Sequence, residues 1–470
     1  MNATDHDAVG PTSAPSGQPG AAAVPSNDGP GERNAALIRE RMARHVGTLA
    51  YIYGYPIVDM RRQMHNETHV VASGQQVLAS LDRFYAYEYL VTPTTAGNLR
   101  VPNNDTLYFG AWFDLATEPR IIHAPDTAGR YYTMAITDFY AESHHVGRRT
   151  TGTGERYFAL VGPNWDGELP PYVHRVNLPT PQVWILGRMM VDGERDFHTA
   201  LALIKAFWAA PLSQFRPGVP PAPPAPPQLA AALEPLGTLQ FYAELNDWLR
   251  RHPGEPGEAA LMDLFDQIGI GPHRSFDAET IDAATRCGLE AAISDGEAMV
   301  LASTQRPLRD LRNGWIFTTG FGRYGSDYLM RASVVKGGYA NAAEESTYAA
   351  KVFDDEGRLL DGSRRYHWHL DPEQIPPAGA FWSLAAYDLQ TQQLIENPLR
   401  RYSLGDRTQG LLRNADGSLD FWIQRDEPAA GTSNWLPVGA GAFMLVLRIY
   451  EPGPAIFDGS YKPGRLRVFG

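Results

Sequence analysis

The spacing of apolar residues along the chain switches between a helical period and strict two-residue alternation. Over 33–64 the apolar positions recur every three or four residues, which predicts a helix with an interruption near Gly54 and Pro56. The same spacing over 75–90 predicts a second helix. From 99 to 192, short runs of alternating apolar and polar residues are separated by Gly, Pro, Asn and Asp, as in antiparallel strands.

Helical spacing returns after residue 192 and is broken by RPGVPPAPPAPPQ at 216–228, which predicts a stiff surface loop. Alternating runs then resume and continue to the end of the chain. The pattern therefore predicts an α+β, mainly β protein, in which a helical block separates two antiparallel β-sandwich domains. The expected divisions are a disordered tail (1–32), N-terminal helices (33–98), a first β-sandwich (99–192), the helical block (193–334) and a second β-sandwich (335–470).

Composition narrows the class of function. The 53 Asp and Glu exceed the 41 Lys and Arg, giving a net charge of -12, and nucleic-acid binders normally carry a basic stripe instead. The acidic balance also disfavours an anionic membrane as partner. No apolar run reaches membrane-spanning length, and residues 1–32 lack the cationic start and apolar core of a secretory signal. We expect a cytoplasmic protein. The sequence is compatible with both a monomer and a homo-oligomer.

The only cysteine, Cys287, excludes an intramolecular disulfide. Its apolar surroundings, IDAATRCGLEAAI, predict a small buried side chain.

Polar and aromatic residues concentrate in RVPNNDTLYFGAWFDL at 100–115. Alternation after Thr106 assigns side chains to two faces of a strand, with Leu107, Phe109 and Ala111 on one and Tyr108, Gly110 and Trp112 on the other. Asn103, Asn104 and Asp105 precede this strand, where short polar side chains commonly cap backbone groups. The functional alternative makes Asp105 a general acid or base, or a metal ligand, with both amides orienting a substrate.

A second polar stretch, TDFYAESHHVGRRTTGTG, begins as a strand and passes into a loop. Asp138 precedes two titratable imidazoles, His144 and His145, which point to opposite faces if the segment is extended. Arg148 and Arg149 follow as potential anion anchors. The alternative is a strand connection in which these arginines pair with carboxylates of the sandwich.

A third candidate is YHWHLD at 366–371, where His367 and His369 share one face of a strand. This spacing suits a divalent metal if a third ligand, such as His144, His145 or Asp105, comes from elsewhere in the chain.

If the polar stretches form a pocket, its contacts divide into two sets. The candidate catalytic residues are Asp105, Asp138, His144 and His145. The candidate substrate-binding residues are Asn103, Asn104, Tyr108, Trp112, Tyr132, Tyr140, Arg148, Arg149, Trp382, Tyr402 and Trp435.

The order of motifs resembles a bacterial family of paired domains of unknown function, numbered 1254 and 1214. The motifs are YGYP, NNDTLY, DTAGRYYTMAITDFY and GRRTTGTG, then NGWIF, YGSDYLMRA, PPAGAFWSLAAYD and NPLRRYSLGDRT. The likeness covers about Ala50 to Lys462. It implies two β-sandwich domains flanking helices, with a cleft or tunnel between them. The chain departs from the family in His144 and His145 and in lacking an evident signal peptide.

The leading hypothesis is an enzyme that acts on a small polar or carboxylated molecule by acid/base chemistry, as a hydrolase, lyase or isomerase without an organic cofactor. The motifs G-x-S-x-G, G-x-G-x-x-G and H-E-x-x-H and the Walker loop are all absent from the sequence. Two alternatives remain: a metal-dependent oxygenase or hydrolase using His367 and His369, and a non-catalytic protein that binds a small molecule or carbohydrate.

Overall fold

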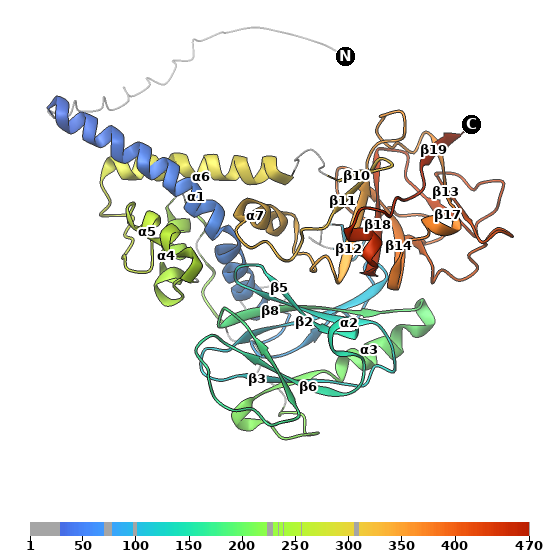
Figure 1. Cartoon of the computed structure of the whole chain (residues 1–470), viewed down its shortest axis with the longest axis horizontal. Helices are drawn as coiled ribbons and strands as arrows, with labels where there is room; N and C mark the ends of the chain where they lie inside the picture. Colours follow the sequence, from blue (N-terminus) through green and yellow to red (C-terminus); the bar gives the residue numbers. More distant parts are fainter. Residues whose placement is uncertain are drawn as a thin grey trace, which may run out of the picture.

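A computed structural model describes residues 29–69, 78–96, 101–222, 229–233, 235–237, 239–254, 256–304 and 310–469. The predicted disordered tail lies outside these residues up to position 28, as does the predicted proline-rich loop from 223 to 228. The described chain forms a helical layer and two sheet-rich bodies (Figure 1). The predicted fold class, α+β and mainly β with a helical block between two sandwiches, is confirmed.

Helix α1 (Pro30–Thr68) runs through Gly54 and Pro56, so the predicted interruption is wrong. A proline inside a helix removes one backbone hydrogen bond, but tertiary contacts support this turn. The buried Arg331 donates from Nη2 to the carbonyl of Tyr53 at 2.9 Å. Gly54 also lies so close to α4 (Gln240–Arg251) that an added Cβ would be 2.5 Å from Leu245 Cδ2.

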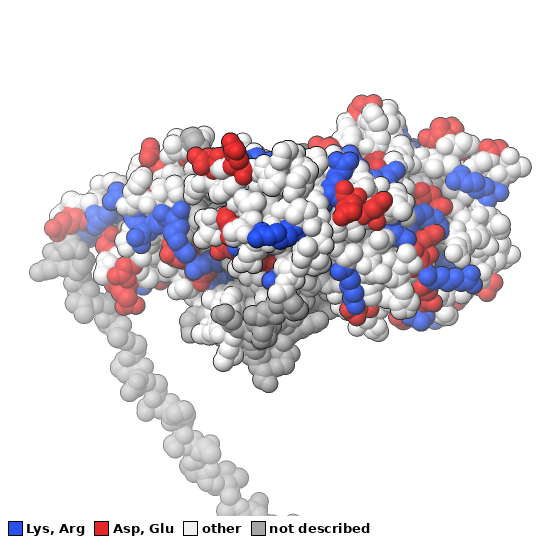
Figure 2. Space-filling view, turned by 90° about the horizontal axis from the view of Figure 1, so that it is seen from below, with Lys and Arg blue, Asp and Glu red and all other residues white. Residues whose placement is uncertain are grey.

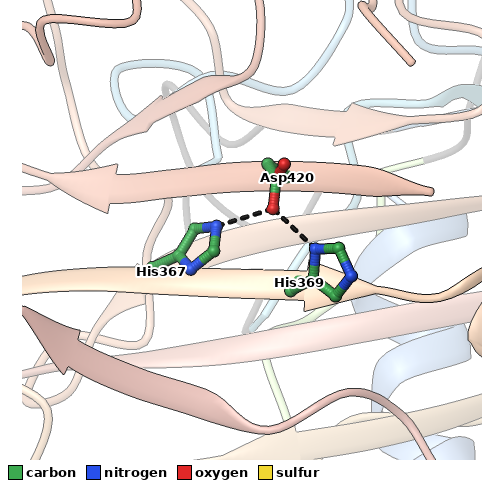
Figure 3. A group of neighbouring side chains, drawn as sticks. All are labelled: His367, His369 and Asp420. Carbon is green, nitrogen blue, oxygen red and sulfur yellow. Dashed lines mark hydrogen bonds and ion pairs between the residues drawn. The ribbon is translucent and has the colours of Figure 1, made fainter. Parts of the chain in front are cut away.

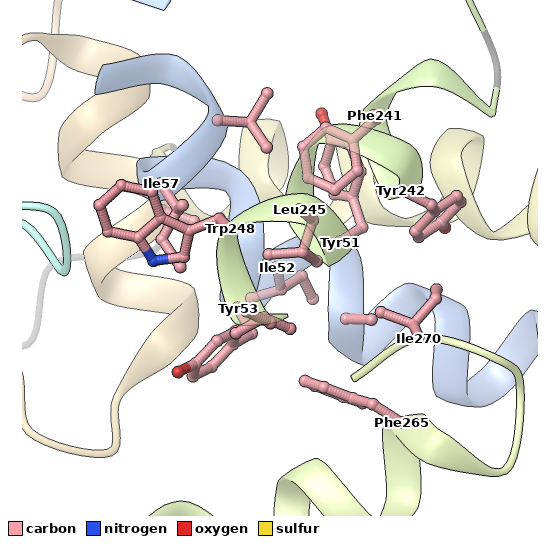
Figure 4. Close-up of a cluster of buried hydrophobic side chains, with 14 of the residues drawn as sticks. Tyr51, Ile52, Tyr53, Ile57, Phe241, Tyr242, Leu245, Trp248, Phe265 and Ile270 are labelled. Atoms are coloured by element: carbon pink, nitrogen blue, oxygen red, sulfur yellow. The ribbon is translucent and has the colours of Figure 1, made fainter. Parts of the chain in front are cut away.

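The helical layer packs around α1. Its other members are α4 (Gln240–Arg251), α5 (Ala259–Asp266), α6 (Ala283–Thr304) and α7 (Tyr328–Gly337). Aromatic and aliphatic side chains fill the space between them, with Tyr51 of α1 beside Phe241 of α4 and Tyr53 of α1 beside Phe265 of α5 (Figure 4). Removing these large apolar surfaces from water is the main stabilisation of the layer.

Helix α6 lies along α1 at close range (Figure 1). A Cβ added to Gly288 would be 2.3 Å from the carbonyl oxygen of Glu40. The neighbouring Cys287 is exposed, so the prediction of a buried side chain is wrong. Successive residues of a helix are rotated by about 100°, and Gly288 and Leu289 take the buried positions.

The first sandwich stacks a five-stranded sheet of order β1-β2-β8-β4-β5 on a four-stranded sheet of order β7-β6-β3-β9. The first sheet comprises β1 (Tyr85–Ala86), β2 (Thr106–Asp114), β8 (Gln182–Met190), β4 (Tyr132–Asp138) and β5 (Ser143–Gly147). The second comprises β7 (Val173–Asn177), β6 (Arg156–Val161), β3 (Arg120–Ala124) and β9 (Trp208–Pro211). All pairs are antiparallel except β6 with β7. Leu107, Phe109 and Ala111 face the core between the sheets, as the alternation predicts.

The helix predicted over 75–90 is wrong for its described part. Residues 78–90 form turns and strand β1, which pairs with β2 through Tyr85 and Gly110. Tyr85, Tyr87 and Tyr89 recur every second residue, with successive ring centroids 5.9 and 5.7 Å apart. That two-residue period is the strand signal in this segment.

The second sandwich stacks a six-stranded sheet of order β10-β11-β12-β18-β14-β15 on a four-stranded sheet of order β17-β16-β13-β19. The first comprises β10 (Leu311–Arg312), β11 (Trp315–Thr318), β12 (Ser346–Lys351), β18 (Phe443–Pro452), β14 (Ala378–Asp388) and β15 (Ser403–Gly405). The second comprises β17 (Trp435–Pro437), β16 (Leu419–Gln424), β13 (Arg365–Leu370) and β19 (Leu466–Phe469). Strands β10 and β11 lie in the range predicted as helical, because β11 pairs with β12 far along the chain.

Shorter elements connect these bodies. They are α2 (Arg148–Thr151), α3 (Phe197–Lys205), α8 (Pro454–Phe457) and the 3-10 turns Glu194–Asp196, Leu212–Gln214, Pro256–Glu258 and Pro372–Gln374.

The outer face of the five-stranded sheet is covered by two different bodies. At one end Trp112 and Trp184, stacked at 5.4 Å, join the core of the helical layer. Further along the same strands, Tyr108 and Arg188 face the six-stranded sheet of the second sandwich. The two sandwiches therefore meet through sheet faces that carry buried polar side chains.

The surface carries charges of both signs. Figure 2 shows Lys and Arg interspersed with Asp and Glu on the face seen there. Among the described helices, none combines the length and the apolar character needed to cross a membrane.

Candidate functional site

Asn103 shapes the entry to β2. Its Oδ1 accepts hydrogen bonds from the backbone N–H groups of Asp105 and Thr106, both at 3.0 Å. Its Nδ2 donates to Tyr108 Oη at 2.7 Å. Asn104 instead donates from Nδ2 to the carbonyl of Val91 at 2.5 Å. The capping interpretation is therefore confirmed for Asn103.

Asp105 joins the two sandwiches. Its Oδ2 accepts a hydrogen bond from Ser383 of β14 at 2.6 Å, and its Oδ1 accepts one from Ser403 of β15 at 2.9 Å. Arg407 Nη2 lies 3.9 Å from Oδ1. The carboxylate is only 7% exposed, so these partners replace most of its water.

A pocket of about 940 Å³ opens above Asp105. Both sandwiches contribute to its wall, through segments 89–95, 104–105 and 191–197 on one side and 382–383 and 399–409 on the other. Four of the predicted site residues line it, namely Asn104, Asp105, Trp382 and Tyr402. Ser383 and Ser403 were not predicted, because a serine inside a strand gives no signal of a partner in another domain.

His145 is enclosed between the sandwiches. Burial, then the positive charges of Arg149 and Arg188, lowers its pKa well below the usual 6.5, so the ring is neutral. Its Nε2 accepts from the backbone N–H of Ala342 at 3.0 Å, which leaves Nδ1 as the protonated nitrogen facing Thr133 Oγ1 at 3.0 Å. With both nitrogens engaged, these contacts favour a structural role.

His144 and Asp138 meet at a turn. His144 Nε2 lies 3.1 Å from Asp138 Oδ2, and Asp138 Oδ1 accepts from the backbone N–H groups of Tyr140 and Glu142. Neither residue lines the pocket above Asp105.

Arg148 and Arg149 hold the sandwiches together. Arg148 Nη1 donates to Glu451 Oε2 at 2.5 Å, and Arg149 Nε donates to Glu345 Oε2 at 2.7 Å. The alternative interpretation, in which these arginines pair with sandwich carboxylates, is confirmed.

Four of the aromatic residues predicted to bind substrate lie in other parts of the molecule. Trp112 donates from Nε1 to Glu67 at 2.6 Å and faces the helical layer, where Tyr140 also packs. Tyr132 faces the core of the first sandwich. Trp435 donates from Nε1 to the carbonyl of Gln424 at 2.9 Å in the four-stranded sheet of the second sandwich. None of these four residues lines the pocket.

Behind the pocket floor lies a buried layer of arginines and tyrosines, here called the Arg–Tyr layer. Its members come from both sandwiches: Tyr108, Tyr131, Arg188, Tyr348, Tyr387, Arg448 and Tyr450. The Arg188 guanidinium lies 5.5 Å from the Tyr108 ring centre, and that of Arg448 lies 5.3 Å from the Tyr387 ring centre. Arg448 is close enough to Asp105 and Tyr108 to interact with them electrostatically. Because Asp105 also lines the pocket, the Arg–Tyr layer adjoins the pocket floor.

The two buried guanidiniums have few partners. Arg188 Nη1 donates to Asn341 Oδ1, and Arg448 Nη2 donates to the carbonyl of Val101 at 2.7 Å. Neither forms an ion pair with any carboxylate in the part of the chain that the structure describes. Arg448 Nη1 and Tyr450 Oη are buried without a hydrogen-bond partner among the same residues.

The sequence does contain a signal for the Arg–Tyr layer, namely single arginines within apolar strands. Arg188 and Arg448 each stand alone in an apolar strand, in QVWILGRMM and FMLVLRIYE. A lone arginine inside such a strand requires a polar partner within the fold.

His367 and His369 of β13 meet Asp420 of β16 (Figure 3). His367 Nε2 and His369 Nδ1 each lie 2.7 Å from Asp420 Oδ1. The predicted third partners, His144, His145 and Asp105, are not part of this group. Asp420 was missed because its position opposite His369 depends on the strand register.

Comparisons with known proteins identify two family regions. Residues 81–211 match the family described as "Protein of unknown function (DUF1254)", and residues 345–454 match the family described as "Protein of unknown function (DUF1214)". The first region ends with β9 of the first sandwich, and the second covers β12 to β18. No curated protein matches the sequence.

Two solved structures are similar. The crystal structure of a Vibrio parahaemolyticus protein is 22% identical, with a TM-score of 0.69, and the alignment covers 91% of this chain and 100% of that one. An uncharacterised Burkholderia cenocepacia protein is 12% identical, with a TM-score of 0.42 and coverage of 94% and 90%. The first likeness supports the fold. With both domains present in the predicted order, the chain belongs to the family that pairs DUF1254 with DUF1214.

Proposed function

We propose that the protein binds a small carboxylate between its two β-sandwiches and acts on it by acid/base chemistry. Arg188 and Arg448 are the proposed anion anchors, and Asp105 is the proposed proton-transfer group. Arg148 and Arg149 are not retained as anchors, because each already has a carboxylate partner. His145 is not retained as a base, because both of its nitrogens are engaged.

The observation that carries the proposal is the pair of buried guanidiniums without ion-pair partners. Removing a cation from water costs several kcal/mol unless an anion or several hydrogen bonds replace the water. Arg188 is 6% exposed and Arg448 is 3% exposed. A bound anion between the sandwiches would compensate both charges.

A carboxylate fits the available donors. Guanidinium groups bind carboxylates through two parallel N–H bonds. The unpartnered donors Arg448 Nη1 and Tyr450 Oη lie two residues apart on β18 and so on the same face of the sheet. The tyrosine rings around them would contact the apolar part of the ligand. Asp105 adjoins the layer, and its two serine partners hold the carboxylate in a fixed position.

The first test is binding of small carboxylates, measured as a rise in the thermal unfolding midpoint across a panel of mono- and dicarboxylates. Ligands that bind only the folded state stabilise it by RT ln(1 + L/Kd), where L is the free ligand concentration, so this midpoint rises with ligand concentration and affinity. We expect Arg448→Met to abolish the rise. Without ligand, this variant should change the free energy of unfolding by less than about 2 kcal/mol, since a buried guanidinium without an ion-pair partner contributes little net stability.

Two variants complete the design. Arg365→Met removes an exposed arginine of β13 and should leave the carboxylate effect intact. Asp105→Asn removes a negative charge next to Arg448 and should strengthen anion binding. A full carboxylate effect in Arg448→Met, or no effect of any carboxylate on the native chain, would overturn the proposed anchors.

The catalytic half of the proposal is tested separately, because a non-catalytic binding protein shares the first half. Carboxylates that stabilise the native chain are incubated with it and followed by proton NMR. Conversion by the native chain and none by Asp105→Asn supports acid/base catalysis. Recovery of every bound carboxylate unchanged would leave a binding protein and overturn the catalytic role of Asp105.

A further inference from the structure

We propose that the outer face of the second sandwich holds a divalent transition-metal site, with His367 Nε2, His369 Nδ1 and Asp420 Oδ1 as its ligand atoms. The site is independent of the proposed function. Tyr366, Trp368 and Leu370 of β13 face the sandwich core, so the alternating His367 and His369 face outward from the four-stranded sheet. The pocket above Asp105 is lined by residues of the other, six-stranded sheet of this sandwich.

The strand register brings the three ligands together. His369 and Asp420 are directly opposite each other in the antiparallel pair of β13 and β16, and His367 lies two residues away on the same face. All three ligand atoms lie within 4.8 Å of one another, and each imidazole nitrogen is 2.7 Å from Asp420 Oδ1 (Figure 3). Ligand atoms around tetrahedral zinc are separated by about 3.3 Å, so small side-chain rotations would seat an ion.

Neighbouring side chains orient the three ligands. In metal sites, the nitrogen or oxygen of a ligating side chain that does not bind the metal is commonly hydrogen-bonded to a neighbour. The other nitrogen of His369, Nε2, lies 3.3 Å from Asp371 Oδ1. The other oxygen of Asp420, Oδ2, accepts from Asn414 Nδ2 at 2.7 Å. The His367 ring stacks on Trp422 with centroids 4.6 Å apart. Each ligand is thus oriented by a contact that does not involve its proposed ligating atom.

The charges also suit a cation. Partial burial acts to raise the pKa of Asp420, but hydrogen bonds from Asn414, His369 and His367 outweigh it, so the pKa is lowered and the carboxylate is ionised. The hydrogen bond that the His369 ring donates to the Asp420 carboxylate raises the pKa of His369. A metal ion would replace the proton of this hydrogen bond and release it.

The site is open to solvent. The side chains of His367, Asp420 and His369 are 26%, 29% and 41% exposed. Two imidazoles and one carboxylate suit Zn²⁺ and related divalent ions, and three protein ligands leave positions for water.

Zinc binding to the untagged full chain tests the site, by isothermal titration calorimetry with equilibrium dialysis as a check. We expect one tight equivalent of Zn²⁺. Asp420→Asn keeps an oxygen that accepts from both histidines, so it should fold normally yet lose more than about 100-fold in affinity. Asp371→Asn, which removes only the support of His369, should lose about 10-fold.

A matched control uses a second close histidine pair, His65 and His69 of α1, whose rings stack at 5.0 Å. The double variant His65→Ala/His69→Ala should keep the tight zinc equivalent, and His367→Ala/His369→Ala should lose it. Absence of tight binding by the native chain, unchanged affinity in Asp420→Asn, or loss of binding in the His65/His69 variant would each overturn the site.

Discussion

Burial gives two adjacent histidines different surroundings. His144 and His145 follow each other on β5 and point to opposite faces, as an extended segment requires. His144 reaches the carboxylate of Asp138 at a turn, whereas the side chain of His145 is 1% exposed beside Glu345, Thr133 and Ala342. The sequence motif alone therefore does not distinguish a titratable site from a buried neutral ring.

The buried neutral ring of His145 makes the fold sensitive to acid. In the folded state its pKa lies well below 6.5, whereas in the unfolded chain the ring titrates near that value. The unfolded chain therefore binds more protons below about pH 6.5, and stability is lost as the pH falls through this range. Above it both states are neutral at this ring, and its contribution is fully present.

His145→Gln isolates this effect. The glutamine oxygen can accept from Ala342 N–H as Nε2 does, but it does not titrate. We expect the variant to be less stable than the native chain at pH 7, and this difference to shrink by about 2 kcal/mol between pH 6.5 and 5. Urea denaturation at a series of pH values measures it. A difference that stays constant with pH would contradict the assignment.

At the scale of elements, helix spacing is set by small residues. Gly288 of α6 lies against the backbone of α1, where an added Cβ would be 2.3 Å from Glu40 O and 2.7 Å from Ala43 Cβ. A backbone oxygen cannot rotate away as a side chain can, so the two helices would have to separate.

Gly288→Ala should therefore destabilise the protein by about 2 kcal/mol, although alanine is the better helix former. Gly31→Ala is the control, because it adds the same methyl group to α1 at a position with nothing within 4 Å. That variant should be neutral or slightly stabilising. Thermal and urea unfolding compare the two, and equal effects would show that close contact between α1 and α6 does not limit stability.

Elements with one strong period were predicted well. Every second residue of β2 is apolar and faces the sandwich core. The predicted inward positions of Leu107, Phe109 and Ala111 are confirmed. Residues 78–90 were mistaken for helix because their apolar positions fit both periods, and pairing of Tyr85 with Gly110 decides between them. The interruption predicted at Pro56 is also wrong, because α1 continues through this position.

At the scale of the whole molecule, Glu345 links the sandwiches. Its side chain is 1% exposed, accepts from Tyr131 Oη at 2.8 Å and pairs with Arg149 at 2.7 Å. The adjacent Glu344 is 51% exposed and lies 4.0 Å from Arg323. Two neighbouring glutamates therefore differ in whether they contribute to the junction.

Glu345→Gln should lower the free energy of unfolding by about 2 kcal/mol, because a charge-assisted bond is lost while Arg149 stays in place. Glu344→Gln should change it by less than about 0.5 kcal/mol. Limited proteolysis of the folded variants adds a local readout, with faster cleavage between the sandwiches expected only in Glu345→Gln. Equal stability of the two variants would argue against Glu345 as a link.

The sequence by itself determined the fold class, the inward face of β2 and the family. These depend on residues a few positions apart, where the period of the backbone fixes which side chains share a face. Only the tertiary structure decided which polar groups meet. Asp105 and Ser383 are 278 residues apart, and Asp420 reaches His369 through strand register. Such pairs depend on how whole sheets pack and align, which no local pattern encodes.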